Sequence, residues 1–329
     1  MRHIVPLFCF LYTCFSAQAQ KITGVNFVAE KTSVDSNAFV HLKTINPKWM
    51  SWSPYAFCDK TTGKISFNHP WQWEGESLEG TAKAIELSHA SGLKVMIKPH
   101  IWMSDNSYTG TINLTDSAWI IWKATYKKYI LSFAVLAQKH QVELLCIGTE
   151  QYAAIKKDSK YWFQLIDEIK AVYKGKLTYA ENWDSYSFCP FWSKMDYIGV
   201  DAYFPLSTKA KPSIKKLKRE WWLWKKQLED VSQRYNKKIV FTEFGYKASE
   251  YTTVKPWEHN TDKTYCEQCQ VNALSAMFLE IWTNEWFAGG FIWKWYEKEK
   301  SIKQSHKKSF SFQGKLAEKL IQETFKKLQ

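Results

Sequence analysis

Short runs of apolar and β-branched residues alternate along the chain with longer stretches in which apolar residues recur at helical spacing. The short runs predict buried strands, and the longer stretches predict helices that cover them. Eight strands are expected, at Ile22–Ala29, Trp49–Pro54, Lys94–Trp102, Glu143–Glu150, Lys176–Asn182, Met195–Tyr203, Lys238–Tyr246 and Gly290–Tyr296. Helices are expected at Leu78–Ser91, Ala118–His140, Tyr161–Tyr173, Pro212–Tyr235, Cys266–Trp286 and Gln313–Leu328.

The strands and helices alternate in units of about 40 residues, which fits a (β/α)8 barrel better than a doubly wound sheet. The helices that should follow the first and fifth strands are short. No linker rich in Pro, Gly or Ser divides the chain. We therefore expect a single α/β domain, a (β/α)8 TIM barrel over residues 20–329, with Phe57–Ser77 as a long loop over its top.

The first nineteen residues have the three parts of a secretory signal peptide. Arg2 and His3 precede an apolar stretch, and Ala17-Gln18-Ala19 is a small-x-small cleavage site. We expect cleavage after Ala19 and a secreted or periplasmic protein. The alternative is a lipoprotein acylated at Cys14, but Tyr12 and Thr13 are unfavourable residues before a lipidated cysteine.

Removal of this leader leaves five cysteines, Cys58, Cys146, Cys189, Cys266 and Cys269, in an oxidising compartment. Since five is odd, at least one thiol should stay free. The spacing of Cys266 and Cys269 is that of a redox pair or half a zinc site, but no second C-x-x-C accompanies it. We expect these two cysteines to be buried or incidental.

Composition and charge narrow the function only a little. Aromatic residues make up 17% of the chain, and we expect some of their rings to face a ligand. The formal net charge of +13 permits an acidic partner, but the lysines concentrate in helices and loops on the barrel exterior, which favours a solvated surface. No run after the leader is long and apolar enough to span a membrane, and we expect a monomer.

Motifs for other chemistries are missing. The chain has no G-x-G-x-x-G, no G-x-x-x-x-G-K-[ST], no H-E-x-x-H and no G-x-S-x-G, and its eight histidines are scattered. We therefore expect no nucleotide cofactor, no metal and no nucleic-acid partner.

Polar residues at the carboxyl ends of barrel strands are the candidate reacting groups, because the βα loops meet there around an open mouth. Two carboxylates stand out, because Glu150 and Glu243 each close an apolar strand. The other strand-end residues are Lys98, His100, Asn182, Asp201, Tyr203, Trp293 and Trp295.

A pair of carboxyl groups on nearly opposite strands is suited to cleavage of a glycosidic bond. One protonates the leaving oxygen, while the other attacks the anomeric carbon or activates water. At the roughly 5 Å separation of a retaining mechanism, each charge would raise the pKa of the other group. The structural alternative is that Glu150 caps the next helix and Glu243 pairs with a neighbouring lysine such as Lys98.

The same residues resemble glycoside hydrolase clan A, and within it family 113, the β-mannanases. The similar segments are Lys94–His100, Ile147–Glu150, Thr242–Gly245 and Gly290–Trp293, and the similarity spans essentially the whole mature chain. It implies a retaining, endo-acting hydrolase of β-1,4-mannan or glucomannan, with Glu150 as acid/base and Glu243 as nucleophile. One residue departs from the pattern, because the clan usually has Asn where this chain has Thr149. Asn182 is a candidate replacement for its contact with the sugar.

The remaining mouth residues fit sugar binding, because pyranose rings stack on aromatic side chains and their hydroxyls need polar partners. The candidate substrate-binding residues are Lys98, His100, Trp102, Asn182, Trp183, Asp201, Tyr203, Tyr246 and Trp293. Two alternatives stay open: a hydrolase of another β-linked glycan, and a non-catalytic barrel that only binds glycans. The paired carboxylates favour an enzyme, because a binding protein gains nothing from desolvating two acids.

Overall fold

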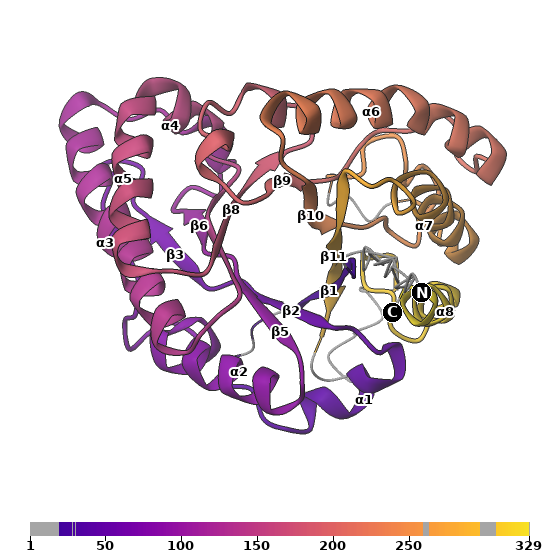
Figure 1. Cartoon of the computed structure of the whole chain (residues 1–329), viewed down its shortest axis with the longest axis horizontal. Helices are drawn as coiled ribbons and strands as arrows, with labels where there is room; N and C mark the ends of the chain where they lie inside the picture. The colour runs from indigo at the N-terminus through magenta and orange to yellow at the C-terminus, as the bar shows by residue number, and fades with distance from the viewer. Residues whose placement is uncertain (1–19, 28, 30, 259–262, 297–306, 329) are drawn as a thin grey trace, which may run out of the picture.

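Eight parallel strands close into a barrel in the described part of this computed structural model, which comprises residues 20–27, 29, 31–258, 263–296 and 307–328 (Figure 1). The order around the barrel is β1-β11-β10-β9-β8-β7-β5-β2. The barrel strands are β1 (Ile22–Phe27), β2 (Trp49–Trp52), β5 (Lys94–Ile97), β7 (Leu144–Thr149), β8 (Lys176–Asn182), β9 (Ile198–Asp201), β10 (Ile239–Phe244) and β11 (Phe287–Trp295). The predicted TIM barrel is confirmed. The signal peptide and Cys14 lie outside the described residues.

Helices surround the barrel, as Figure 1 shows. They are α1 (Ala38–Ile45), α2 (Leu78–Ala90), α3 (Asp116–Lys139), α4 (Tyr152–Lys157), α5 (Ser159–Val172), α6 (Ile214–Tyr235), α7 (Glu267–Ile281) and α8 (Leu316–Lys327). The segment after β8 has only two short 3-10 turns, η3 (Tyr186–Phe188) and η4 (Trp192–Lys194). No helix among the described residues is long and apolar enough to cross a membrane.

Successive side chains along each strand point alternately into the barrel and out toward the helices, so the core has two layers. Inward-facing side chains such as Met96, Cys146, Val240 and Phe291 form a small cluster inside the barrel. Their neighbours face outward and join the larger cluster between strands and helices. All these side chains are buried, so the barrel interior is filled and only its ends are open to a ligand.

The predicted third strand, Lys94–Trp102, is divided into two. Its first part is β5 in the barrel, and its second is β6 (His100–Met103) in a separate sheet of order β4-β3-β6. Pro99 lies at the division, where it has no N–H to continue the barrel ladder. The expected loop Phe57–Ser77 is therefore wrong in part: it contains the end of β3 (Tyr55–Cys58), β4 (Ile65–Ser66) and η1 (Glu74–Glu76).

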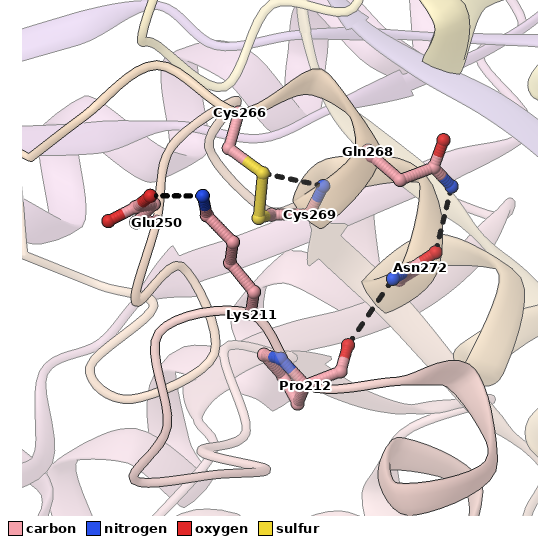
Figure 2. The surroundings of a disulfide bond; sticks show 7 residues. All are labelled: Lys211, Pro212, Glu250, Cys266, Gln268, Cys269 and Asn272. Atoms are coloured by element: carbon pink, nitrogen blue, oxygen red, sulfur yellow. Dashed lines mark hydrogen bonds and ion pairs between the residues drawn. A yellow bond between two sulfur atoms is a disulfide. The ribbon is translucent and has the colours of Figure 1, made fainter.

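Cys266 and Cys269 form a disulfide at the start of α7 (Figure 2). Cys266 is the N-cap residue, and its sulfur accepts a hydrogen bond from the backbone N–H of Cys269 at 3.2 Å. Cys269 is buried, as we expected, but the pair is not incidental, because its two sulfurs form a disulfide that leaves neither free to bind zinc. Cys58, Cys146 and Cys189 are buried free thiols, which confirms that at least one thiol stays free.

Candidate active site

The two candidate carboxylates lie at the same end of the barrel on strands well separated in its order. Glu150 directly follows β7, and Glu243 is the penultimate residue of β10. Two strands, β8 and β9, separate them on one side of the barrel. Both carboxyl groups therefore lie at the mouth of the barrel.

Both oxygens of Glu243 accept hydrogen bonds from cationic or neutral donors. Lys98 pairs with Oε1, and the Tyr203 hydroxyl donates to Oε2 at 2.5 Å. Nε2 of His100 lies 3.8 Å from Oε1, too far for a hydrogen bond. Burial raises the pKa of Tyr203 well above its usual range, and the negative charge of Glu243 raises it further. Tyr203 is therefore a permanent donor, and Glu243 has the environment of an ionised carboxylate.

Lys98 joins Glu243 to a third carboxyl group, that of Asp201. Its Nζ lies 3.0 Å from Oδ1 and 3.1 Å from Oδ2 of Asp201, which also accepts from Oγ1 of Thr242 at 2.8 Å. Burial alone lowers the pKa of Lys98, but the charges of Asp201 and Glu243 raise it above its ordinary value. Burial and the charge of Glu243 raise the pKa of Asp201 to about 7, against the attraction of Lys98.

Glu150 has the opposite environment. Its carboxyl group forms no ion pair or hydrogen bond with any residue that the structure describes. Burial raises its pKa well above the ordinary value, and the charges of Asp201 and Glu243 raise it further, with Lys98 opposing them. A raised pKa favours the protonated form of Glu150, which is the form a general acid needs.

The backbone holds Glu150 in a left-handed conformation, with φ of 51°. For a residue with a side chain this conformation costs about 1–3 kcal/mol, and it persists only where neighbours enforce it. Here the Glu150 N–H donates to the carbonyl of Ala180 at 2.7 Å, and the N–H of Gln151 donates to the Tyr179 hydroxyl at 2.6 Å. Gln151 Nε2 donates to the Tyr126 hydroxyl at 2.9 Å. The acid is thus fixed from the neighbouring strand β8 and from α3.

These contacts bear on both interpretations of the carboxylates. Glu243 does pair with Lys98, as the structural alternative predicts. Glu150 does not cap α4, whose N-cap residue is Gln151 and has no side-chain capping bond. A protonated acid opposite a stabilised carboxylate is what displacement at an acetal carbon requires.

An aromatic pocket of about 560 Å³, lined by neither carboxylate, includes residues at the ends of β1, β2 and β11. Trp102 and Trp293, both expected at the site, line it, and Trp102 is 49% exposed. The sequence reasoning missed the other main lining residues, which are Tyr55, Trp71, Trp73, Glu76 and Lys294. Burial raises the pKa of Glu76 to about 7. The alternation of Tyr55 with Phe57, and of His100 with Trp102, was the available signal for the small sheet that carries part of this pocket.

His100 connects the pocket to Glu243. Its ring packs against Tyr55 at a centroid distance of 4.9 Å. Burial and the neighbouring Lys98 lower the pKa of His100 well below its ordinary value, so it is neutral near pH 7. Its buried Nε2 has no hydrogen-bond partner among the described residues, which leaves it free for a ligand hydroxyl.

Asn182 and Trp183 lie at the end of β8. Trp183 stacks on Trp257 with centroids 5.0 Å apart and 20° between the ring planes. Oδ1 of Asn182 accepts from the N–H of Trp183 at 2.9 Å. Trp257 comes from the long loop between β10 and α7, and the sequence reasoning missed it. A second aromatic surface, which shares no residue with the pocket, therefore lies at the end of β8.

Two expected substrate-binding residues are in the wrong environment for that role. Tyr246 is fully buried. Lys98 is also fully buried and is occupied by Asp201 and Glu243. Thr149, which stands where the clan usually has Asn, is 6% exposed and donates its hydroxyl to the carbonyl of Pro99 at 3.2 Å.

Comparisons with solved structures agree with the barrel fold. A GH113 β-mannanase, AaManA from Alicyclobacillus acidocaldarius in complex with ManMIm, superposes with a TM-score of 0.81 at 22% identity, covering 94% of this chain and 98% of that one. A GH113 β-1,4-mannanase complex superposes with a TM-score of 0.82 at 19% identity, covering 93% of this chain and 99% of that one. A β-D-glucuronidase from Dictyoglomus thermophilum superposes with a TM-score of 0.66 at 16% identity, covering 94% of this chain and 51% of that one. These structures share the fold.

The comparison with curated proteins gives no match. The model of Glycoside Hydrolase Family 113 matches residues 27–315, which is most of the chain. That match includes both carboxylates, the aromatic pocket and the stacked tryptophans. The chain therefore belongs to glycoside hydrolase family 113.

Proposed function

We propose that this glycoside hydrolase is a retaining, endo-acting enzyme that cleaves β-1,4-mannan or glucomannan. One observation carries the proposal: Glu243 is held by Lys98 and Tyr203, whereas Glu150 has a raised pKa and no cationic partner of its own among the described residues. Two carboxyl groups in opposite protonation states are suited to double displacement.

In the first step, the Glu243 carboxylate attacks the anomeric carbon while Glu150 gives its proton to the departing glycosidic oxygen. The bond between the anomeric carbon and that oxygen breaks, and a glycosyl ester of Glu243 forms. Lys98 and Tyr203 hold the attacking carboxylate in place, and the neutral His100 Nε2 is available to a sugar hydroxyl.

In the second step, the ionised Glu150 takes a proton from water, which attacks the anomeric carbon and releases Glu243. Two inversions give net retention of the β configuration. The proton returns to Glu150 without an outside donor. The raised pKa of Glu150 favours this return between turnovers.

The arrangement of aromatic side chains supports an extended glycan and internal cleavage. We assign the aromatic pocket to sugars on the non-reducing side, because Trp293 lies on β11, the strand next to that of Glu243. We assign Trp183 and Trp257 to sugars beyond the cleaved bond. A glycan bound on both sides of the carboxylates would be cut within its chain. Mannan is the proposed substrate because the superposed family members are named β-mannanases.

Incubation with mannohexaose, glucomannan, β-glucan and xylan tests this proposal. We expect new reducing ends from the two mannose-containing substrates, and the β anomer as the first product in proton NMR spectra. Glu243→Ala and Glu150→Ala are the matched inactive controls. No cleavage at high enzyme concentration would indicate a glycan-binding barrel, and preferential cleavage of another glycan would overturn the substrate assignment.

We also propose export of the chain, with cleavage after Ala19. Support comes from the order of basic residues, apolar stretch and small-x-small site in the first nineteen residues. Mass spectrometry of the exported protein should find Gln20, free or cyclised, at the N-terminus. An acylated Cys14 at the N-terminus would instead identify a lipoprotein.

A further inference from the structure

Five lysines surround a recess at the end of the barrel opposite the carboxylates. The recess has a volume of about 360 Å³, and its lining includes Lys21, Lys48, Lys94, Lys176 and Lys238. No Asp, Glu or His lies among the described residues that line it. This recess is separate from the aromatic pocket and shares no lining residue with it.

The fold brings these lysines together from distant parts of the sequence. Each immediately precedes or begins a barrel strand, namely β1, β2, β5, β8 and β10. Because all eight strands are parallel, their amino ends lie at one end of the barrel. The lysines therefore form a ring at the amino end, whereas Glu150 and Glu243 lie at the carboxyl end.

Charge in this ring is not neutralised by the described part of the protein. None of the five lysines forms an ion pair with any carboxylate that the structure describes. The Lys21 ammonium donates to the carbonyls of Asn284 and Phe287 at 2.7 and 2.6 Å. Lys176 donates to the Tyr197 hydroxyl at 3.1 Å. These are neutral acceptors, so the positive charges remain.

Of the acidic groups near the ring, Glu143 and Asp196 belong to other contacts, whereas Glu285 acts on Lys21 through its charge. Glu143 accepts hydrogen bonds from the N–H of Val95 at 2.9 Å and lies 3.2 Å from His89. Asp196 accepts from the N–H of Leu177 at 2.8 Å. Glu285 raises the pKa of Lys21, but burial and the charge of Lys238 outweigh it and lower that pKa to about 8. The lysine ammonium groups therefore repel one another, and a bound anion would relieve this electrostatic repulsion.

Aromatic rings lie close to the ammonium groups of two of the recess lysines. Nζ of Lys94 lies 5.7 Å from the centre of the Trp49 ring, and Nζ of Lys176 lies 5.2 Å from that of Tyr197. Both rings also line the recess. These rings are neutral cation–π partners, and both lysines stay exposed.

We propose that this recess binds a compact anion with several negative charges, of the oligophosphate class. Several ammonium groups around one small cavity suit a ligand that presents many oxygens at short spacing, and lysine binds phosphate as a point charge. The convergence of the lysines on one recess favours a free anion over the flat surface of an anionic membrane.

Isothermal titration calorimetry with sodium tripolyphosphate tests the proposal on the exported protein. We expect 1:1 binding that weakens steeply with added NaCl, and binding of sulfate at least roughly tenfold weaker. Lys94→Gln/Lys238→Gln removes two exposed ring lysines and should weaken tripolyphosphate binding roughly tenfold or more. The matched control is Lys128→Gln/Lys215→Gln, which removes two exposed lysines on α3 and α6 and should change affinity less than about twofold.

Three results would overturn this proposal. The first is no tripolyphosphate binding at low salt, and the second is equal loss in the ring and control variants, which would indicate attraction by net charge alone. The third is flotation with phosphatidylcholine vesicles containing phosphatidylglycerol, lost in the ring variant, without tripolyphosphate binding. That result would assign the ring to a lipid surface. Mannan cleavage is not a readout in any of these measurements, so the outcome is independent of the proposed function.

Discussion

Tyr203 donates its hydroxyl hydrogen to Glu243, with 2.5 Å between the phenol oxygen and Oε2. Tyr203 follows β9, and Glu243 lies in the neighbouring strand β10. The other oxygen of Glu243 is paired with Lys98. The Glu243 carboxylate, the proposed nucleophile, is thus held by a neutral donor on one oxygen and a cation on the other, and removal of either should slow the chemical step.

Tyr203→Phe should lower kcat for mannohexaose roughly 10- to 100-fold, because a hydrogen bond to a charged group contributes about 1.5–3 kcal/mol. KM should change less than about threefold, since the loss falls on the nucleophile. Tyr246→Phe is the control, because the hydroxyl of Tyr246 is buried without a hydrogen-bond partner among the described residues. Steady-state kinetics of both variants check this prediction, and equal losses would contradict it.

Trp257→Ala should impair long substrates selectively. The variant removes the ring that stacks on Trp183, and we expect KM for mannohexaose to rise about five- to tenfold. An aryl β-mannobioside, whose sugars would fill only the aromatic pocket, should keep its kcat/KM within about twofold. Trp222→Ala is the control, because Trp222 is 71% exposed on α6. An equal loss on both substrates would show that the stacked pair is structural.

Glu150→Gln should stabilise the protein at alkaline pH. The folded-state pKa of Glu150 is raised, so its contribution to stability is fully present below the unfolded value near 4.5 and is lost as pH rises through the folded pKa. The variant cannot ionise. We expect its Tm to match that of the wild type near pH 4 and to exceed it by roughly 2–4 °C at about pH 8.

Calorimetric scans across this pH range measure the difference. Glu323→Gln, at an exposed position on α8, is the control and should give no pH-dependent difference. If Glu150→Gln had the same Tm difference at both pH values, ionisation of Glu150 would not oppose folding.

Replacement of both Cys266 and Cys269 by serine should destabilise the chain modestly. Because the disulfide closes a short loop in the unfolded chain, its loss should lower the free energy of unfolding by about 2 kcal/mol and Tm by roughly 3 °C. A serine hydroxyl at the N-cap position would still cap α7. Wild-type protein treated with dithiothreitol should lose the same amount, while the variant should not respond to it. A reductant-insensitive Tm of the wild type would contradict this expectation.

The sequence was sufficient to predict the eight barrel strands and the residues at their ends, though not the small sheet β4-β3-β6. A buried strand has a short, regular pattern, and parallel strands bring their carboxyl ends together, so Glu150, Glu243, Asp201 and Tyr203 follow from position alone. Tyr246 shows where this rule fails. It lies two residues beyond β10, where the chain has left the strand and packs inward.

The residues that line the pocket were harder to predict, because their position depends on tertiary structure. Trp71, Trp73 and Glu76 belong to a segment whose only complete strand, β4, has two residues, too few for a periodic signal. Lys294 lies near the end of β11, and Trp257 lies in the long loop between β10 and α7, so the positions of both depend on how these segments fold. The lysine ring could have been predicted from the lysines that begin or precede the expected strands, because parallel strands also bring their amino ends together.

The anomeric configuration of the azide product from Glu150→Ala tests the central claim most directly. This variant should form the glycosyl ester of Glu243 with an aryl β-mannobioside, whose good leaving group needs little protonation. With Glu150 absent, azide should attack the ester from the β face and restore turnover. Proton NMR should then show a β-mannobiosyl azide. An α azide would identify Glu150 as the nucleophile and contradict the roles assigned to the two carboxylates.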